Sequence, residues 1–353
     1  MQQQHSTRIN SMANAAKNIT KLPDPLNRVL IERTLENGLH LLQKSVPFGV
    51  VGMVYEARPN VTVDAAVILI KSGNAALLRG SATASESNKV LVDVIRTAFA
   101  GSKISQEVVQ LIPSDDRSTV SALLTAKGLV DLVIPRGGAE LIRSVVENAT
   151  VATIETGAGV CHVYVDKSAD LSKAIAILIN SKCDRPSTCN AAETLLIDKA
   201  IAESFTPMAL KALAEAGVVI NCDLPTKKIA DQIAVATKSA TDQSWSTEYG
   251  DLEINVAQVN GVLEAIAHIA KFGTQHTEAI VATDADAIRK FTTLNDCAAI
   301  MVNASTRFTD GGQMGFGAEI GISNQKMHAR GPMGLEQMTT TTWIVSGDGQ
   351  IRQ

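Results

Sequence analysis

Residues 46–157 alternate short aliphatic runs with segments of helical apolar spacing, and this alternation is the strongest constraint on the fold. The strand-like runs are 46–55, 75–79, 108–112, 129–134 and 151–155. The helix-like segments between them are 64–72, 85–100, 118–125 and 139–147. Strands separated by helices are typical of a doubly wound parallel sheet with buried aliphatic strands. This region is therefore predicted to be an α/β domain.

The same pattern starts again after Gly159, which predicts a second α/β lobe. Its strand-like runs are 160–165, 194–197, 218–220, 278–282 and 298–302. Its helix-like segments are 171–182, 200–216, 262–271 and 285–293. The section 221–249 is more irregular, and 304–333 is rich in glycine and loops, which in a compact protein is usually a functional stretch. Two lobes also suit a chain of 353 residues, because one core rarely grows that large.

The chain ends carry smaller elements. Residues 11–22 are weakly helical, and 339–345 is a final β-rich strand. Asn37-Gly38 is a good turn pair between the strand-like pieces 28–36 and 38–44, so a hairpin is predicted there. An exposed hairpin usually needs a partner surface, which indicates a contact between subunits.

Composition excludes several classes of function. Charged residues make up 19% of the chain and the net charge is −4, which gives no electrostatic case for binding nucleic acid or a membrane. No apolar run is long enough to span a bilayer, and the polar start lacks the apolar centre of a signal peptide. The five irregularly spaced cysteines favour a reducing cytoplasm, and no Cys/His spacing predicts a metal site.

A candidate nucleophile, Cys189, lies in the stretch Ser181–Glu193, SKCDRPSTCNAAE. Pro186 interrupts any helix there, so Cys189 is predicted at or near the start of a new helical turn. The positive end of a helix favours a thiolate, and Arg185 is close in sequence. The alternative is a small buried cysteine, but the polar flanks and the proline favour a nucleophile.

Polar or glycine-rich turns follow the strands of the first domain, where ligands of such sheets bind. These turns carry Asn60, Arg79-Gly80-Ser81, Arg136-Gly137-Gly138 and Glu155-Thr156-Gly157. Any single glycine here is explained by a tight turn, but four such turns on one sheet edge indicate a ligand site. None of them is a GxGxxG fingerprint, so the standard dinucleotide motif is missing from the sequence.

Seven motifs of this chain occur together in one enzyme family. They are VPFGV from Val46, YEARPNVT from Tyr55, IPRGG from Ile134, GVCHVYVD from Gly159, RPSTCN from Arg185, VNASTRFTDGGQ from Val302 and HARGPMGLE from His328. On these residues the chain resembles the γ-glutamyl phosphate reductase family, a branch of the aldehyde dehydrogenase superfamily. The resemblance runs from about the hairpin to the C-terminus, and the last three motifs are specific to this branch.

The resemblance implies NADPH-dependent reduction of L-glutamyl 5-phosphate to glutamate 5-semialdehyde and phosphate, the second step of proline biosynthesis. It also implies an aldehyde-dehydrogenase-like fold in three parts. These are a Rossmann-like cofactor domain at 1–27 and 46–157, a catalytic domain at 158–335, and a small oligomerisation hairpin and strand at 28–45 and 336–353. A cytoplasmic homo-oligomer is expected, and association with glutamate 5-kinase is left open.

For catalysis, the resemblance makes Cys189 the nucleophile that displaces phosphate and leaves a thioester. Asn60 matches the side-chain amide that stabilises the oxyanion together with the Cys189 backbone N–H. From the residues alone, Asn60 is equally well a turn residue after a proline.

For the cofactor, Arg79 stands where many aldehyde dehydrogenases have a cofactor-contacting lysine. Ala82 replaces the acid that NAD enzymes often carry three residues later, which favours NADPH because an acid would repel a 2′-phosphate. Gly80 and Ser81 belong to the same turn. Gly137 and Gly138 would let the backbone approach the cofactor, with Arg136 beside them. The alternative for Arg79 is a surface arginine at a strand end.

Glu155 matches the general base that hydrolyses the thioester in other members of the superfamily, a step that a reductase does not need. It is either a cofactor contact, with Thr156 and Gly157, or a residue kept away from water activation. A hydrolytic semialdehyde dehydrogenase is therefore a second hypothesis.

The substrate is anionic, so cationic partners and hydrogen-bond donors are expected for it. The candidates are Arg185, Asn303, Ser305, Thr306, Arg307 and Arg330, each of which is equally well a solvated residue or a loop brace. The other cysteines, together with His162 and His328, are interpreted as structural.

One departure from the family pattern is the N-terminus, where MQQQHS stands in place of a longer helical region. The cofactor domain is therefore expected to be shortened. A third hypothesis follows, a truncated, non-catalytic paralogue that binds nucleotide or a partner subunit.

Overall fold

The computed structural model describes residues 2–116 and 118–352, which form two compact units. The first unit extends to Thr156 and also contains Gly311–Ile322 and the C-terminal part from Met327. The second unit is Gly157–Asp310 with Ser323–Lys326. The expected catalytic domain continued to residue 335, whereas Ile320, Met333 and Leu335 pack into the hydrophobic core of the first unit.

The first unit contains a four-stranded parallel sheet in the order β5-β4-β3-β6. Its strands are β3 (Val50–Tyr55), β4 (Ala75–Arg79), β5 (Val109–Leu111) and β6 (Leu132–Arg136). Its helices are α2 (Pro59–Lys71), α3 (Ser85–Ala98), α4 (Ser118–Thr125) and α5 (Ala139–Asn148). The predicted alternation is confirmed here except at 151–155, where only Thr153 makes an isolated bridge, to Val133.

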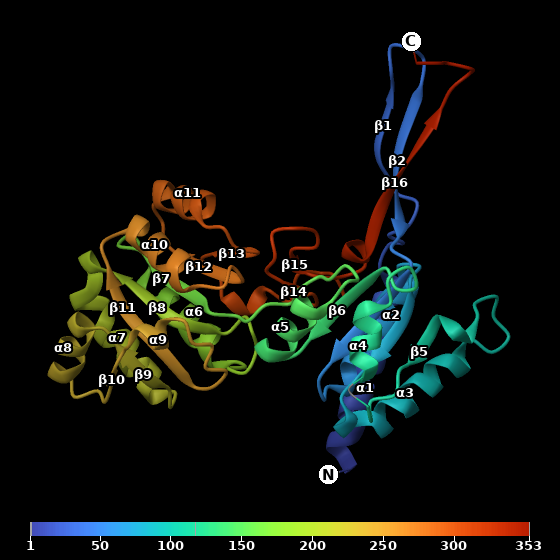
Figure 1. The fold of residues 1–353 in the computed structure, drawn as a ribbon. Coiled ribbons are helices and arrows are strands. Elements are labelled where there is room, and N and C mark those ends of the chain that lie inside the picture. Colours follow the sequence, from blue (N-terminus) through green and yellow to red (C-terminus); the bar gives the residue numbers. More distant parts are fainter. Residues whose placement is uncertain (1, 117, 353) are drawn as a thin grey trace. The chain divides into compact units, whose positions relative to one another are not determined.

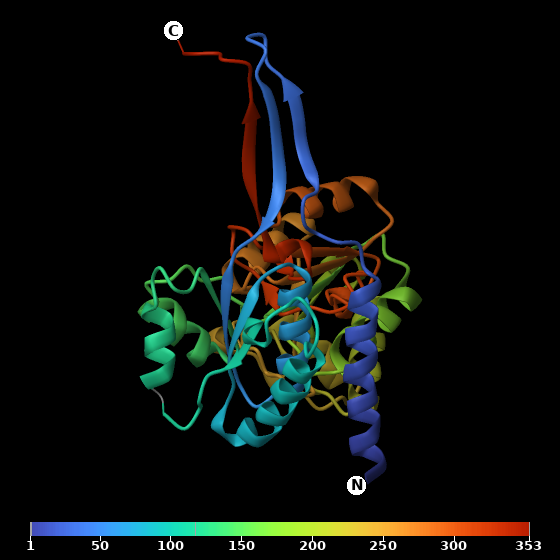
Figure 2. The same ribbon diagram turned by 90° about the vertical axis from the view of Figure 1, so that its right-hand side faces the viewer.

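Side chains of β3 alternate between two apolar clusters because successive residues of a strand point to opposite faces. Met53 belongs to the cluster that contains α2 and Ile19 of α1 (Gln2–Lys21). Val54 belongs to the opposite cluster, with Leu123 of α4 and Val145 of α5. Helix α1 packs beside α2 (Figure 2) and is longer than the predicted 11–22.

A separate three-stranded antiparallel sheet has the order β1-β2-β16. Its strands are β1 (Val29–Thr34), β2 (His40–Pro47) and β16 (Thr339–Ser346). The predicted hairpin is confirmed, since Thr34 pairs with His40 around the Asn37-Gly38 turn. In Figure 1 this sheet projects as a long ribbon from the rest of the first unit. Its exposed apolar side chains are Val29, Leu30, Ile31, Trp343, Ile344 and Val345.

The second unit contains a seven-stranded parallel sheet in the order β10-β9-β11-β8-β7-β12-β13. Its strands are β7 (Cys161–Val165), β8 (Ala192–Asp198), β9 (Val219–Cys222), β10 (Lys238–Ser239), β11 (Glu253–Val259), β12 (Thr277–Val281) and β13 (Ala299–Val302). Its helices are α6 (Leu171–Cys183), α7 (Ala202–Glu215), α8 (Leu224–Gln232), α9 (Asp242–Trp245), α10 (Val262–Phe272) and α11 (Ala285–Leu294).

Helices cover both faces of this sheet, as in Figure 1. Val163 of β7 packs with α6 and α7, while the next residue, Tyr164, packs with α10 and α11. Both faces of the sheet are therefore buried, which explains why strands such as β8 and β13 contain consecutive aliphatic residues with no alternation of apolar and polar side chains.

The section interpreted as irregular contains α8, α9 and β10, and is followed by the central strand β11, which the sequence analysis missed. Its buried Asn255 interrupts the apolar pattern, but the Asn255 amide donates to the Glu193 and Ser244 carbonyls. A satisfied buried amide is compatible with a core strand.

The remaining elements are short. They are the two-stranded pair β14 (Ile322–Ser323) and β15 (Gly331–Pro332), and the 3₁₀ turns η1 (Ala82–Ala84), η2 (Gln106–Val108), η3 (Lys199–Ile201), η4 (Thr306–Phe308) and η5 (Glu336–Met338).

Candidate active site

Cys189 lies half-buried in a turn that joins α6 to β8 in the second unit. The Thr188 amide donates to the Arg185 carbonyl at 3.2 Å and the Ala191 amide donates to the Thr188 carbonyl at 2.9 Å. These two turns close the loop, and β8 begins at once. Among the described residues no helix begins at Cys189, so the prediction of a helical turn starting there is wrong, and no helix N-terminus lies at its thiol.

The Cys189 carbonyl is packed tightly against the segment that leads into β7. A side-chain carbon at Gly159 would lie 1.5 Å from this oxygen, so only glycine fits there. The Cys161 thiol donates to the same oxygen at 3.2 Å. Complete burial raises the pKa of Cys161 well above its usual value, which keeps this thiol protonated and able to donate.

Arg307 of η4 contacts the turn on both sides of the cysteine. Its Nε donates to Asp184 Oδ2 at 3.1 Å, and its Nη1 donates to Thr188 Oγ1 at 2.8 Å and to Asn190 Oδ1. Its side chain is only 13% exposed. Arg307 is a predicted substrate contact, whereas these bonds are all internal to the second unit.

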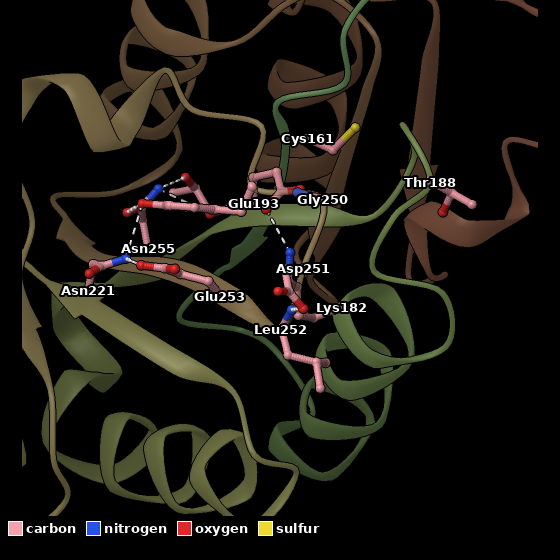
Figure 3. A network of polar contacts seen from close by, with 12 residues as sticks. Cys161, Lys182, Thr188, Glu193, Asn221, Gly250, Asp251, Leu252, Glu253 and Asn255 are labelled. Carbon is pink, nitrogen blue, oxygen red and sulfur yellow. Dashed lines mark hydrogen bonds and ion pairs between the residues drawn. The ribbon is translucent and has the colours of Figure 1, made fainter. Parts of the chain in front are cut away.

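A buried ion pair joins the two elements that flank the cysteine turn (Figure 3). Lys182 Nζ, at the end of α6, lies 2.6 Å from Glu193 Oε2, at the start of β8, and both side chains are fully buried. The Gly250 amide donates to Glu193 Oε1 at 3.4 Å. Burial raises the pKa of Glu193 to about 7, although the Lys182 ammonium acts in the opposite direction.

The other substrate candidates of the second unit have varied surroundings. Asn303 exchanges two hydrogen bonds with the backbone of Ala282, at 3.0 and 2.9 Å. Ser305 and Thr306 are buried against Ser181 of α6. Arg185 is exposed beside the cysteine turn. Arg330 is half-buried and belongs to the first unit.

In the first unit, Arg79 ends β4 and Arg136 ends β6, the strands on either side of β3, at the carboxyl edge of the sheet, where they pair with Val54 and Tyr55 of β3. Asn60 is exposed in the first turn of α2, and its amide donates to Asp64 Oδ2 at 3.3 Å. Burial raises the pKa of Asp64, while Asn60 and the Arg136 charge lower it. Asn60 is thus helical and not a turn residue.

Arg79 is held by long hydrogen bonds to the loop after β5. Its Nη2 donates to the carbonyls of Ser114 and Asp116 at 3.4 and 3.3 Å, and its Nε donates to Thr119 Oγ1 at 3.4 Å. A cavity of about 880 Å³ lies beside this loop. It is lined by residues of α3, which include Ser85, Lys89 and Arg96, and by the loop after β5, which includes Ser114 and Asp115.

The Gly137-Gly138 turn contacts an acidic residue, Glu56, which was not among the predicted site residues. The Gly138 amide at the start of α5 donates to Glu56 Oε1 at 2.9 Å. A side-chain carbon at Gly137 would lie 2.7 Å from the Glu56 carboxyl carbon. The signal in the sequence was the position of Glu56 directly after β3, beside the other strand-end turns.

The last predicted strand-end turn is Glu155-Thr156-Gly157. The boundary between the two units falls within it. Thr156 is buried in the first unit, where its hydroxyl donates to the Pro135 carbonyl at 2.8 Å, and Glu155 is half-buried beside it. Gly157 begins the second unit. Ser81 caps η1 by accepting a hydrogen bond from the Thr83 amide.

Comparison with known proteins decides the family. Residues 2–244 match the aldehyde dehydrogenase family. Gamma-glutamyl phosphate reductase of Thermobifida fusca is 52% identical over 98% of this chain and 82% of its own length. The enzyme of the same name from Kineococcus radiotolerans is 52% identical over 98% of this chain and 80% of its length. The chain belongs to the γ-glutamyl phosphate reductase family.

The family assignment extends to the three-dimensional structure. The crystal structure of γ-glutamyl phosphate reductase from Thermotoga maritima superimposes with a TM-score of 0.95 at 45% identity, covering 99% of this chain and 83% of that one. The chain is therefore an oxidoreductase with the aldehyde-dehydrogenase-like α/β fold that the motifs predicted.

Two further observations concern the described residues of this γ-glutamyl phosphate reductase family member. Within 2–116 and 118–352, His, Cys, Asp and Glu do not gather in threes in a way that could hold a metal ion. Across the same residues, every helix is too short or too polar to cross a bilayer.

Proposed function

We propose that this protein reduces L-glutamyl 5-phosphate to glutamate 5-semialdehyde and phosphate with NADPH, in the second step of proline biosynthesis. The observation that carries the proposal is Cys189, half-buried in a tightly held turn, in a chain 52% identical to proteins named for this reaction. The first unit is assigned to cofactor binding, the second to catalysis, and the β1-β2-β16 sheet to homo-oligomerisation.

Cys189 is the nucleophile. Its thiolate attacks the acyl carbon of the acyl phosphate, forms a carbon–sulfur bond, and expels phosphate with the electron pair of the broken carbon–oxygen bond. NADPH, when bound, supplies the hydride that reduces the resulting thioester. The hemithioacetal oxyanion then collapses, which releases the aldehyde and restores the thiolate.

Asn60 and the Cys189 backbone N–H are the proposed donors to the negative oxygen that forms in both steps. Removing one such donor typically costs about 3–4 kcal/mol of transition-state stabilisation. Asn60 is exposed, and its side-chain amide makes a long hydrogen bond to Asp64. Exchanging this bond for one to a ligand should therefore cost little free energy.

The first unit fits NADPH in three respects. Arg79 and Arg136 stand at the carboxyl edge of its sheet, where ligands of such folds bind. The cavity beside the Arg79 loop is lined by the cations Lys89 and Arg96, which pair with Glu86 and Glu107 and suit a phosphate group, and by the acids Asp93 and Asp115. Ala82 leaves no acid at the position that would repel a 2′-phosphate.

The reverse reaction tests the proposal. Purified protein is mixed with glutamate semialdehyde, NADP and phosphate, and NADPH absorbance is followed. We expect phosphate-dependent NADPH formation that falls at least 10³-fold in Cys189→Ala, because the nucleophile is lost. Cys297→Ser is the matched control, since its hydroxyl can still donate to the Ala299 carbonyl as the thiol does.

Each other outcome has a definite meaning. NADPH formation without phosphate would contradict the reductase assignment and favour hydrolysis with Glu155 as base. Tight NADPH binding with no turnover, in protein shown to be folded, would favour a non-catalytic paralogue.

A further inference from the structure

The Arg307 side chain contacts both sequence neighbours of the proposed nucleophile. It lies on η4 and reaches Thr188 and Asn190, which precede and follow Cys189, and also Asp184 at the end of α6. A planar guanidinium is suited to this task because its donors are arranged in a rigid fork.

The cross-link is reciprocal. The Asn190 amide Nδ2 donates back to the Thr309 carbonyl at 2.8 Å, just beyond η4. Thr188 Oγ1 lies 2.7 Å from the Arg185 carbonyl and 3.0 Å from Asn190 Oδ1. The turn is therefore also stabilised by hydrogen bonds between its own residues. Asn190 is buried and Arg307 nearly so, and hydrogen bonds there compete little with water.

We propose that Arg307 is a positioning residue that holds the Cys189 turn, and that it is not a contact for the substrate carboxylate or phosphate. The proposal rests on Cys189 being the nucleophile. By fixing Thr188 and Asn190, Arg307 sets the direction of the Cys189 thiol and of its backbone N–H before substrate arrives. The Asp184 carboxylate neutralises its charge, which leaves little attraction for an anionic substrate.

The experiment compares Arg307→Met and Arg307→Lys with wild type. Arg289→Met is the control, since Arg289 is an exposed arginine of α11 in the same unit that pairs with Asp286. Three quantities are measured: kcat and the KM for semialdehyde and phosphate in the reverse reaction, the rate at which iodoacetamide alkylates Cys189 in the free enzyme, and the melting temperature. Alkylation is quantified by mass spectrometry of the Cys189 peptide.

We expect kcat to fall on the order of 10²-fold in both Arg307 variants, with each KM changed less than about threefold, because a misplaced reacting group affects the chemical step. Lysine should not restore the rate, since it keeps the charge but not the fork. Alkylation of Cys189 should slow by about fivefold or more in both variants, because the displaced turn no longer holds the Cys189 thiol and its backbone N–H in their fixed positions. Arg289→Met should match wild type in all three quantities.

A tenfold rise in KM with kcat and alkylation unchanged, restored by lysine, would identify Arg307 as a substrate contact and overturn the proposal. Unchanged kcat and alkylation would overturn it too. If Arg307→Met does not fold, Arg307→Lys and Thr188→Val decide, because Thr188→Val removes one of the three bonded partners and should show a milder form of the same pattern.

The alkylation measurement separates this proposal from the proposed function. Protein without reductase activity in which Cys189 alkylation still depends on Arg307 would contradict the function and leave the positioning role standing. Active protein in which alkylation of Cys189 is independent of Arg307 would support the proposed function and contradict the positioning role.

Discussion

The cysteine turn of the second unit and the strand-end turns of the first unit are built in opposite ways. Side chains hold the cysteine turn: Arg307 on its flanks and the Lys182–Glu193 pair across its base. The first unit instead offers glycine backbone, and Arg79 makes long bonds of 3.3–3.4 Å to the carbonyls of Gly80, Ser114 and Asp116. The difference suits their proposed tasks, because a nucleophile must be held rigidly whereas a cofactor edge must admit a ligand.

The largest effect is expected where the cysteine turn is packed most tightly. Gly159→Ala places a carbon where the Cys189 carbonyl lies, so the turn must move. We expect about 1–3 kcal/mol or more of lost stability and a fall in kcat on the order of 10²-fold. The measurements are chemical denaturation and reverse-reaction kinetics.

The stability control for this substitution is Gly138→Ala in the first unit. There the added carbon would meet only the Glu56 carboxylate, at 3.5 Å. Wild-type kcat in Gly159→Ala would show that the cysteine turn tolerates displacement, and the contrast between the two regions would disappear.

The next effect concerns the buried pair beneath the turn. Because the folded pKa of Glu193 is raised to about 7, the folded protein binds more protons than the unfolded chain between about pH 4.5 and 7. The contribution of Glu193 to stability is therefore present below pH 4.5 and is lost as the pH rises through 7. At about 1.4 kcal/mol for each pH unit, the loss is about 3 kcal/mol at most.

Urea unfolding of the second unit between pH 5 and 7.5 measures this dependence. Trp245 reports on that unit if Trp343 is first replaced by Phe. Glu193→Gln keeps an oxygen that can accept from Lys182 Nζ but has no carboxyl group to titrate, so its stability should have a flatter pH profile. An unchanged profile in Glu193→Gln would assign the pH dependence to other groups.

The smallest effect is expected at the open edge of the first unit. Arg79→Gln should raise the KM for NADPH about tenfold, equivalent to about 1.4 kcal/mol, and leave the KM for NADH nearly unchanged, because only NADPH carries the 2′-phosphate. Coenzyme kinetics are compared with Lys103→Gln, which removes an exposed cation from the loop before β5, at the opposite edge of the same sheet. An equal rise in the KM for NADPH and the KM for NADH would show that Arg79 does not recognise the 2′-phosphate.

Local pattern was sufficient for much of the fold. The aliphatic runs of β3, β4 and β6 were visible because every residue of these strands is buried or half-buried, and the Asn37-Gly38 turn identified the hairpin. The sequence pattern did not predict β11. Its buried Asn255 resembles a surface residue unless the two carbonyls that accept from its amide, those of Glu193 and Ser244, are known. The pattern also failed at 151–155, which has apolar residues but only one bridge.

For the site, the sequence identified Cys189 as the candidate but gave the wrong physical setting for it. Residue types show that a cysteine after a proline and among polar neighbours is suited to chemistry. They do not show that a turn, and not a helix, follows Pro186. The roles of Glu56 and of the Lys182–Glu193 pair had no local signal of comparable strength, because each depends on a partner from another element.

The sequence by itself determined the alternating α/β architecture, the hairpin, the family and the candidate nucleophile, since all of these are encoded in short-range periodicity or in contiguous motifs. Only the tertiary structure decided what holds the nucleophile. Arg307 meets Thr188 and Asn190 because β12 and β13 bring η4 back beside the end of α6, and such long-range contacts are set by how the sheet is assembled.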